Sequence, residues 1–190
     1  MPNLYIIAGC NGAGKTTASE TILPQMLNCR EFVNADNIAK GLSPFNVESV
    51  AFEAGRLMLT RINELVQENL DFAIETTLST RSYRSLVQKA QRQGYKVTLL
   101  FVWLQDVEMA RERVALRVSM GGHDIPPYLI ERRYHRGLQN LFKVFIPEVD
   151  AWLLVNNSNQ ELEHIAYGEK NIEPSVENEY LWSQIREYVT

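Results

Sequence analysis

Residues 4–16 read LYIIAGCNGAGKT, an apolar run that leads directly into a glycine-rich segment. Its first five residues are apolar or aromatic, as in a strand covered on both faces. The next eight, Gly9 to Thr16, match the pattern G-x-x-x-x-G-K-[ST] at every fixed position. Glycines let such a loop turn tightly, so that its backbone N–H groups can surround a phosphate. A strand that runs directly into this pattern, with a helix at its end, predicts a nucleotide-binding phosphate loop.

The chemistry of phosphate assigns roles within this loop. Backbone N–H groups and the positive end of the following helix attract the phosphates of ATP. Lys15 is predicted to reach the β- and γ-phosphates, and Thr16 to offer its hydroxyl to Mg²⁺. The predicted ATP-binding residues are Gly9, Asn11, Gly12, Ala13, Gly14, Lys15, Thr16 and Thr17.

Beyond the loop, short apolar runs alternate with longer segments of helical period. Further strands are expected at 31–35, 72–74, 96–104, 152–155 and 164–167, and helices at 47–68, 82–93, 106–120, 126–145 and from about 178. Strands joined by helix-length connections form parallel sheets with right-handed crossovers. We therefore predict an α/β fold of the P-loop NTPase or nucleoside-kinase type, as a single domain over residues 1–190. Its sheet is expected to have about five mostly parallel strands, with helices on both faces.

Two carboxylates follow apolar strands, which is where the working residues of open α/β sheets lie. Asp36 is expected to end the second strand and Glu75 the third. A phosphotransferase needs a group that takes the proton of the acceptor and an acid that holds the metal. Both carboxylates are candidates for these roles. Asp36 could also cap a helix that begins at residue 37 or 38, and Glu75 could lie in a turn held by the hydroxyls of the two threonines that follow it.

An arginine-rich segment follows the central strand. Arg113 and Arg117 lie four residues apart on one face of a predicted helix, and a glycine pair separates them from a second helix that carries Arg132 and Arg133. This pattern predicts a lid over about residues 117–136, whose arginines offset the charge on a transferred phosphoryl group. Two surface helices with ion pairs would give the same pattern.

Three other features carry weaker predictions. His123, in the turn between the two helices, is either a phosphate contact or a turn residue. The segment 156–158, Asn-Asn-Ser, follows the fifth strand at the place where P-loop kinases receive adenine. The tail over 158–190 holds seven acidic residues against two basic ones. It is expected to complete the edge of the sheet and to cover it with a helix.

Composition limits the classes of partner. A formal net charge of −4 and a pI of about 5.5 argue against general binding of nucleic acid, because phosphate backbones attract basic surfaces. Cys10 and Cys29 are predicted to be free thiols of a reducing cytosol. The first residues lack the pattern of a signal peptide, and no apolar run approaches the ~18 residues of a membrane span. We therefore expect a cytoplasmic protein with no membrane partner.

Together these motifs resemble the zeta toxin family, in its short subgroup described as predicted ABC-type ATPases. The resemblance covers residues 4–158 and rests on the phosphate loop, VNAD at 33–36 with GLSP at 41–44, AIETT at 73–77, and GGH at 121–123 ahead of RRY at 132–134. It implies a nucleoside-kinase-like fold and transfer of the γ-phosphoryl group of ATP. In well-known zeta toxins the acceptor is a hydroxyl of a UDP-linked N-acetylated amino sugar, and a cognate antitoxin protein blocks the nucleotide site.

The resemblance also implies roles for single residues. Asp36 would accept the proton of the acceptor hydroxyl. Glu75 and Thr77 would line the acceptor pocket or support the metal, and Arg117 would contact the phosphates from the lid. Further substrate contacts are expected from His123, Arg132 and Arg133.

Two departures from the family pattern leave the acceptor open. His123 stands about where a second lid arginine is expected, and a family carboxylate in the helix before the third strand falls on Leu59. The main alternative is a kinase of another acceptor, such as a nucleoside, an antibiotic hydroxyl or a polynucleotide end. An alternative of another class is a nucleotide-binding switch or toxin component with little turnover.

Overall fold

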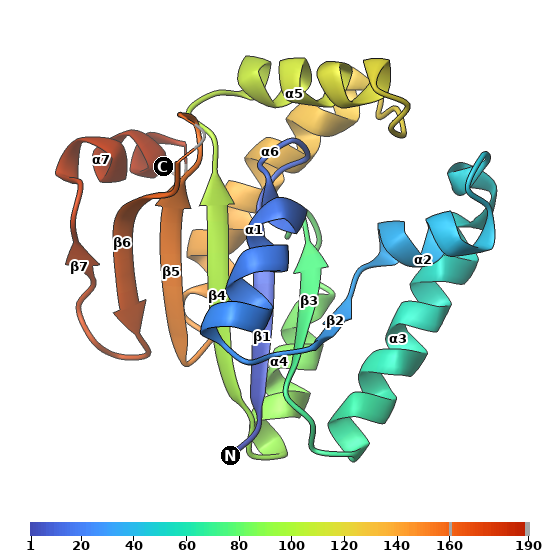
Figure 1. Cartoon of the computed structure of the whole chain (residues 1–190). Coiled ribbons are helices and arrows are strands. Elements are labelled where there is room, and N and C mark those ends of the chain that lie inside the picture. The colour runs from blue at the N-terminus through green and yellow to red at the C-terminus, as the bar shows by residue number, and fades with distance from the viewer. Residues whose placement is uncertain (160, 189–190) are drawn as a thin grey trace.

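A mostly parallel sheet forms the centre of the structure. The computed structural model describes residues 1–159 and 161–188. Within these residues the strands are β1 (Asn3–Ala8), β2 (Glu31–Val33), β3 (Phe72–Thr76), β4 (Lys96–Trp103), β5 (Ala151–Asn156), β6 (Glu163–Glu169) and β7 (Ser175–Val176). Their order in one seven-stranded sheet is β2-β3-β1-β4-β5-β6-β7 (Figure 1).

Strand pairing confirms the predicted parallel core and adds to it. The five strands from β2 to β5 in the sheet order all pair in parallel. The acidic tail then contributes β6 and β7, which pair antiparallel and extend the sheet beyond β5. The tail therefore completes this edge of the sheet, as expected.

Helices up to residue 145 provide the crossovers between the parallel strands, and one further helix follows the last strand. They are α1 (Lys15–Thr21), α2 (Ala35–Leu42), α3 (Ala51–Gln67), α4 (Tyr83–Arg92), α5 (Val107–Ser119), α6 (Pro127–Asn140) and α7 (Glu179–Glu187), with short helical segments at Ile22–Met26, Val47–Val50 and Leu141–Phe145. In Figure 1, α1 lies on one face of the sheet, and α4 and α6 lie on the other. Helices α5 and α2 lie beyond the carboxyl ends of β1, β3 and β4, where ligands of open α/β sheets bind.

Several local predictions are confirmed. Asp106 caps α5 by accepting a hydrogen bond from the backbone N–H of Met109. Gly94 follows α4 with a φ of 85°, the left-handed conformation of a C-terminal glycine. Gly121, with a φ of 88°, comes just after α5, so that the glycine pair separates the two arginine-bearing helices.

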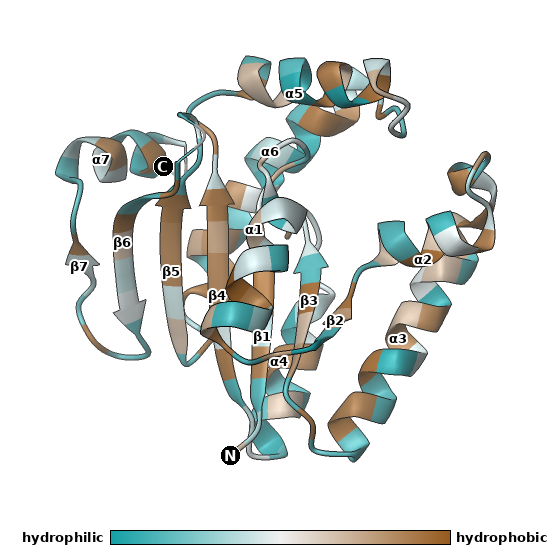
Figure 2. Cartoon of the chain, viewed as in Figure 1, coloured by the Kyte–Doolittle hydropathy of each residue, from teal (hydrophilic) through white to brown (hydrophobic). Residues whose placement is uncertain are grey.

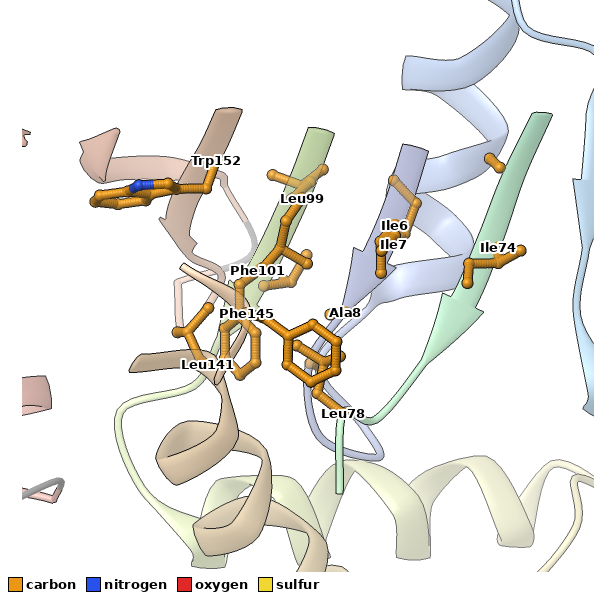
Figure 3. Packing of buried hydrophobic residues seen from close by; sticks show 14 of the residues in the cluster. Ile6, Ile7, Ala8, Ile74, Leu78, Leu99, Phe101, Leu141, Phe145 and Trp152 are labelled. Carbon is orange, nitrogen blue, oxygen red and sulfur yellow. The ribbon is translucent and has the colours of Figure 1, made fainter. Parts of the chain in front are cut away.

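The core lies on both faces of the central strands. Ile6 and Ile7 of β1, Leu99 of β4 and Phe145, which follows α6, are almost fully buried and belong to one hydrophobic cluster (Figure 3). These central strands are coloured as mostly hydrophobic in Figure 2, as the apolar sequence runs predicted. Among the described residues, no helix has both the length and the apolar character needed to cross a membrane.

Two expectations about element ends are wrong. Strand β2 stops at Val33, because its pairing with β3 ends there, and Asn34 begins the turn into α2. Asp36 therefore lies in the first turn of a helix and neither ends a strand nor caps the helix, since Asn34 is the cap. Glu75 does not end the third strand, which continues to Thr76.

Candidate active site

The phosphate loop has the geometry that its glycines predict. Gly9, Gly12 and Gly14 have φ values of 142°, 82° and 85°, in the left-handed region that glycine adopts at low cost. A Cβ atom on Gly9 would lie 2.2 Å from the backbone oxygen of Val102, so only glycine fits between the loop and β4. The loop leads directly into α1, whose first residue is Lys15.

Lys15 is buried, with 6% of its surface exposed. Its Nζ donates a hydrogen bond of 2.9 Å to the backbone oxygen of Cys10 and lies 3.7 Å from Oε1 of Glu75. A buried ammonium needs such partners, because an unpaired charge in the protein interior is costly. The lysine is therefore held at the loop by one carbonyl and one carboxylate.

Glu75 connects the phosphate loop to α2. Its Oε2 accepts hydrogen bonds of 2.8 Å from Oγ1 of Thr16 and 2.8 Å from Nδ2 of Asn34. Oδ1 of Asn34 in turn accepts from the backbone N–H groups of Asp36 and Asn37 at the start of α2. One side chain thus caps the helix and ties it to the carboxylate that also contacts the loop.

The two roles of Asn34, as helix cap and as partner of Glu75, were not predicted from the sequence. Its signal was present, since asparagine between an apolar strand and a helix is a favoured N-cap. Its second role depends on Glu75, which lies 41 residues away along the chain, and no local pattern could show it.

Asp36 is exposed at the rim of the site. Within the part of the chain that the structure describes, its carboxylate makes no hydrogen bond or ion pair, whereas its backbone N–H is held by Asn34. The carboxylate of Asp36 is therefore available to a ligand, and the hydrogen bond from its backbone N–H to Asn34 holds the backbone in place.

These residues line one cavity of about 560 Å³. Its wall combines the phosphate loop, the start of α2, the end of β3 and the two arginine-bearing helices. The lining includes Asn11, Gly12, Gly14, Lys15, Thr16, Thr17, Asn34, Asp36, Glu75, Thr77, Arg113, Arg117 and Arg133. Residues predicted from four separate sequence segments therefore meet at the carboxyl ends of the central strands.

The lid arginines are held by different parts of the site. Nη1 of Arg133 donates a hydrogen bond of 3.1 Å to Oδ1 of Asn11 in the phosphate loop. Arg117 donates to the backbone oxygen of His123 at 3.1 Å, while its Nε is buried without a hydrogen-bond partner among the described residues. Arg117 and Arg133 thus place two guanidinium groups at the cavity wall.

Two predicted substrate contacts lie outside this cavity. Arg132 is exposed and is not part of the lining, and Nε2 of His123 lies 3.9 Å from the carboxylate of Glu48. A helix turns by about 100° per residue, so Arg132 and Arg133 start from different sides of α6, and only Arg133 lines the cavity. Neither His123 nor Arg132 is among the described residues that line the cavity, and His123 accepts a hydrogen bond from the wall only through its backbone oxygen.

The segment that follows β5 contacts the phosphate loop. Nδ2 of Asn157 donates a hydrogen bond of 2.8 Å to the backbone oxygen of Ala13. Nη2 of Arg113 donates to the backbone oxygens of Asn157 and Ser158 at 2.8 and 2.9 Å. Arg113 therefore joins α5 to this segment, a role that its position in an arginine-rich helix did not reveal.

Cys10 and Cys29 are both free, as predicted, and both are buried. Burial raises the pKa of the Cys10 thiol to about 11, with a partial opposing effect of the nearby Lys15 charge. The thiol is therefore protonated at neutral pH, and the backbone oxygen of Cys10 is the atom that contacts the lysine.

The fold and this site define a protein of the P-loop kinase class. The zeta toxin family model matches residues 1–161, and the chain belongs to the zeta toxin family. An uncharacterized protein of Haemophilus influenzae is 28% identical over 126 residues, which cover 66% of this chain and 88% of that protein.

Solved structures share the fold at low sequence identity. A chain of the AvrRxo1-ORF1:AvrRxo1-ORF2 complex with sulphate ions superposes with a TM-score of 0.78 at 22% identity, over 97% of this chain and 63% of that one. This chain therefore spans less than two thirds of that protein. The PezAT toxin–antitoxin system of Streptococcus pneumoniae matches with a TM-score of 0.72 at 16% identity, over 100% and 78% of the two chains. A gluconokinase of Sinorhizobium meliloti matches with a TM-score of 0.51 at 16% identity, over 82% of each chain.

Proposed function

We propose that the chain is an ATP-dependent phosphotransferase that moves the γ-phosphoryl group of ATP to a hydroxyl of a small molecule. One observation carries this proposal: the phosphate loop, Glu75, Asp36 and the lid arginines line the same cavity. Such a cavity provides cations for the phosphates and a free carboxylate for the acceptor, which are the groups that phosphoryl transfer requires.

The ATP phosphates lie along the loop in this proposal, with Lys15 at the β- and γ-phosphates. The Thr16 hydroxyl and the Glu75 carboxylate lie 2.8 Å apart and offer neighbouring oxygen ligands, which Mg²⁺ prefers. No group of three or more His, Cys, Asp or Glu side chains forms a metal cage within the described ranges. This fits an ion that binds through phosphates, waters and one or two protein oxygens, and that neutralises phosphate charge when bound.

Asp36 acts as the base. Its carboxylate accepts the proton of the acceptor hydroxyl, whose oxygen bonds to the γ-phosphorus while the bond to the β–γ bridging oxygen breaks and ADP leaves. Lys15, Arg117 and Arg133 stabilise the charge on the transferred group. Lys15 exchanges the Cys10 carbonyl for phosphate oxygens, which accept a hydrogen bond from an ammonium more strongly.

The acceptor pocket is formed by Asp36, Glu75 and Thr77. A UDP-linked N-acetyl amino sugar is the first candidate acceptor because of the family, and a nucleoside or an antibiotic hydroxyl is the alternative. His123 and Arg132 contribute only if the lid moves, since neither reaches the cavity in this arrangement.

Family membership also supports a toxin role with a protein partner. The structural relatives include a toxin–antitoxin system. We infer that expression of this chain arrests growth, that Lys15→Ala removes the arrest, and that a cognate antitoxin covers the nucleotide site. Arrest that persists with Lys15→Ala would separate toxicity from nucleotide chemistry.

The decisive experiment is ATP consumption with Mg²⁺ across a panel of UDP-sugars, nucleosides and hydroxyl antibiotics. Asp36→Asn keeps the shape of the side chain but removes the base, so we expect a loss of about 10²–10⁴-fold in turnover. ATP binding, measured by calorimetry, should be unchanged in that variant. Normal turnover by Asp36→Asn would refute its role, and ATP binding without transfer to any acceptor would favour a nucleotide-dependent switch.

A further inference from the structure

A second hollow, of about 710 Å³, lies between α3 and α4, beside the phosphate cavity. We name it the side groove. Ala35 and Tyr83 line both hollows, so the side groove opens next to Asp36. The other residues used below that line it are Phe52, Arg56, Met58, Leu59, Ile62, Leu86, Lys89 and Arg92.

The wall of the side groove that α3 provides is apolar. Phe52, Leu59 and Ile62 recur at seven- and three-residue spacing and so share one face of the helix. Ile62 is buried in the core, whereas Phe52 is 82% exposed and Leu59 is 56% exposed on the same face of the helix. Gly55, between them along the helix, has no side chain, and a Cβ atom there would meet no described atom within 4 Å, so this part of the strip is open. The result is an apolar strip that is open to a ligand.

The rim of the side groove is basic. Arg56 comes from α3, and Lys89 and Arg92 come from α4. Lys89 contacts only the neutral Asn63, through a hydrogen bond of 2.8 Å, and Arg56 and Arg92 have no ion-pair partner among the described residues. The residues that line the groove include no aspartate or glutamate. Three cations without a carboxylate attract an anion.

Tyr83 forms the junction between the two hollows. Its hydroxyl lies 3.8 Å from the sulfur of Met58 in the side groove. Burial raises the pKa of Tyr83, and a hydrogen bond with Thr76, which lines the phosphate cavity, opposes that effect. The side chain thus contacts both hollows, and its hydroxyl remains un-ionised at neutral pH.

We propose that the side groove holds the far arm of the phosphate acceptor. The acceptor class is then a hydroxyl-bearing amphiphile: the hydroxyl lies at Asp36, an apolar arm crosses Met58 and Leu59, and an anionic end meets the basic rim. This inference rests on the proposed function for the place of the hydroxyl. The groove, its apolar wall and its charge are independent of that function.

The test uses ω-hydroxy acids, HO–(CH₂)n–COO⁻, as probes of increasing length. Binding is measured by calorimetry without ATP, and transfer is measured by mass spectrometry with ATP and Mg²⁺. Affinity is expected to rise by up to about fourfold for each added methylene until the groove is filled. The neutral diol of the same length is expected to bind at least about fivefold more weakly, since it leaves the basic rim unpaired.

A pair of variants on α3 provides the matched control. Leu59→Glu places a carboxylate in the groove and should remove the dependence on chain length, with a loss of at least about tenfold in affinity for the longest probe. Leu57→Glu makes the same change at a residue that is 43% exposed and does not line the groove, so it should bind the probes as the native chain does. ATP affinity should be unchanged in both.

The outcomes separate the groove from the kinase activity. The side groove is not a ligand site if the affinity for the probes does not change with chain length, or if Leu59→Glu and Leu57→Glu lose the same affinity. Probes that bind but accept no phosphate at any length overturn its assignment to the acceptor. Asp36-dependent transfer to a UDP-sugar in the same preparation would then show that the proposed kinase function survives. Length-dependent binding and transfer, both lost with Leu59→Glu, support the proposal.

Discussion

Replacement of Asn34 by alanine should weaken both the fold and the active site. Oδ1 of Asn34 accepts hydrogen bonds from the first N–H groups of α2, and Nδ2 donates one of 2.8 Å to Glu75. The side chain is buried, with 6% of the residue exposed. Asn34→Ala therefore removes a helix cap and also the tether between α2 and the phosphate loop.

The expected loss of stability follows from these two contacts. A lost asparagine cap costs about 0.5–2 kcal/mol. A hydrogen bond to a charged group contributes about 1.5–3 kcal/mol. Together they predict that the free energy of unfolding falls by about 2–5 kcal/mol. Because α2 carries Asp36, we expect phosphoryl transfer to fall at least about tenfold, the effect of a displaced catalytic group. ATP affinity should change less, since the phosphate loop remains intact.

Asn178 offers a matched control. It caps α7 through Oδ1, and its Nδ2 donates 2.7 Å to Glu163, so the same two contacts occur far from the phosphate loop. Urea unfolding of Asn34→Ala and Asn178→Ala should show destabilisation in both, and only Asn34→Ala should lose transfer activity. If Asn34→Ala unfolds within about 0.5 kcal/mol of the native chain, the size of a typical surface substitution, the reasoning fails.

Three further changes test other parts of the site. Gly9→Ala places a Cβ atom 2.2 Å from the oxygen of Val102, so we expect about 1–3 kcal/mol of destabilisation and loss of ATP binding by calorimetry. Gly41 lies within α2, where a Cβ atom would meet no described atom within 4 Å, so Gly41→Ala should keep ATP binding and stabilise the chain by up to about 1 kcal/mol. Arg113→Ala removes the bond between α5 and the segment after β5, and should lower ATP affinity about tenfold, or about 1.4 kcal/mol; unchanged affinity would contradict this role. Because burial raises the pKa of Cys10 to about 11, its thiol should resist Ellman's reagent at pH 8 in the folded protein and react after denaturation. The thiol of the unfolded chain has a pKa of about 9, so it loses its proton at lower pH than the buried thiol does. Raising the pH from about 9 through about 11 should therefore lower the free energy of unfolding, measured by urea titration at each pH.

The phosphate loop and the elements around it could be predicted because their signals are local. The three glycines adopt left-handed conformations that their own residue type permits, and the apolar run before them forms the central strand. Helix ends at Asp106 and Gly94 likewise follow from side-chain capping and backbone freedom. These features depend on neighbours within a few residues, which the sequence presents directly.

The ends of β2 and α2 could not be predicted in the same way. Asn34 and Asp36 are both good caps, and both follow an apolar run. The choice between them is made by the sheet, because β2 pairs with β3 only from Glu31 to Val33. Asn34 is therefore the first residue after the strand and caps α2, and Asp36 lies in the first turn of this helix.

The parallel α/β fold, the phosphate loop and most polar residues of the site could be predicted from the sequence alone. Which of these residues contact one another depends on the tertiary structure. Thr16 and Glu75 are 59 residues apart, Arg133 and Asn11 are 122 apart, and the side groove forms where α3 and α4 pack. These contacts depend on strand order and helix packing, which arise from the whole core, and no short stretch of sequence carries that information.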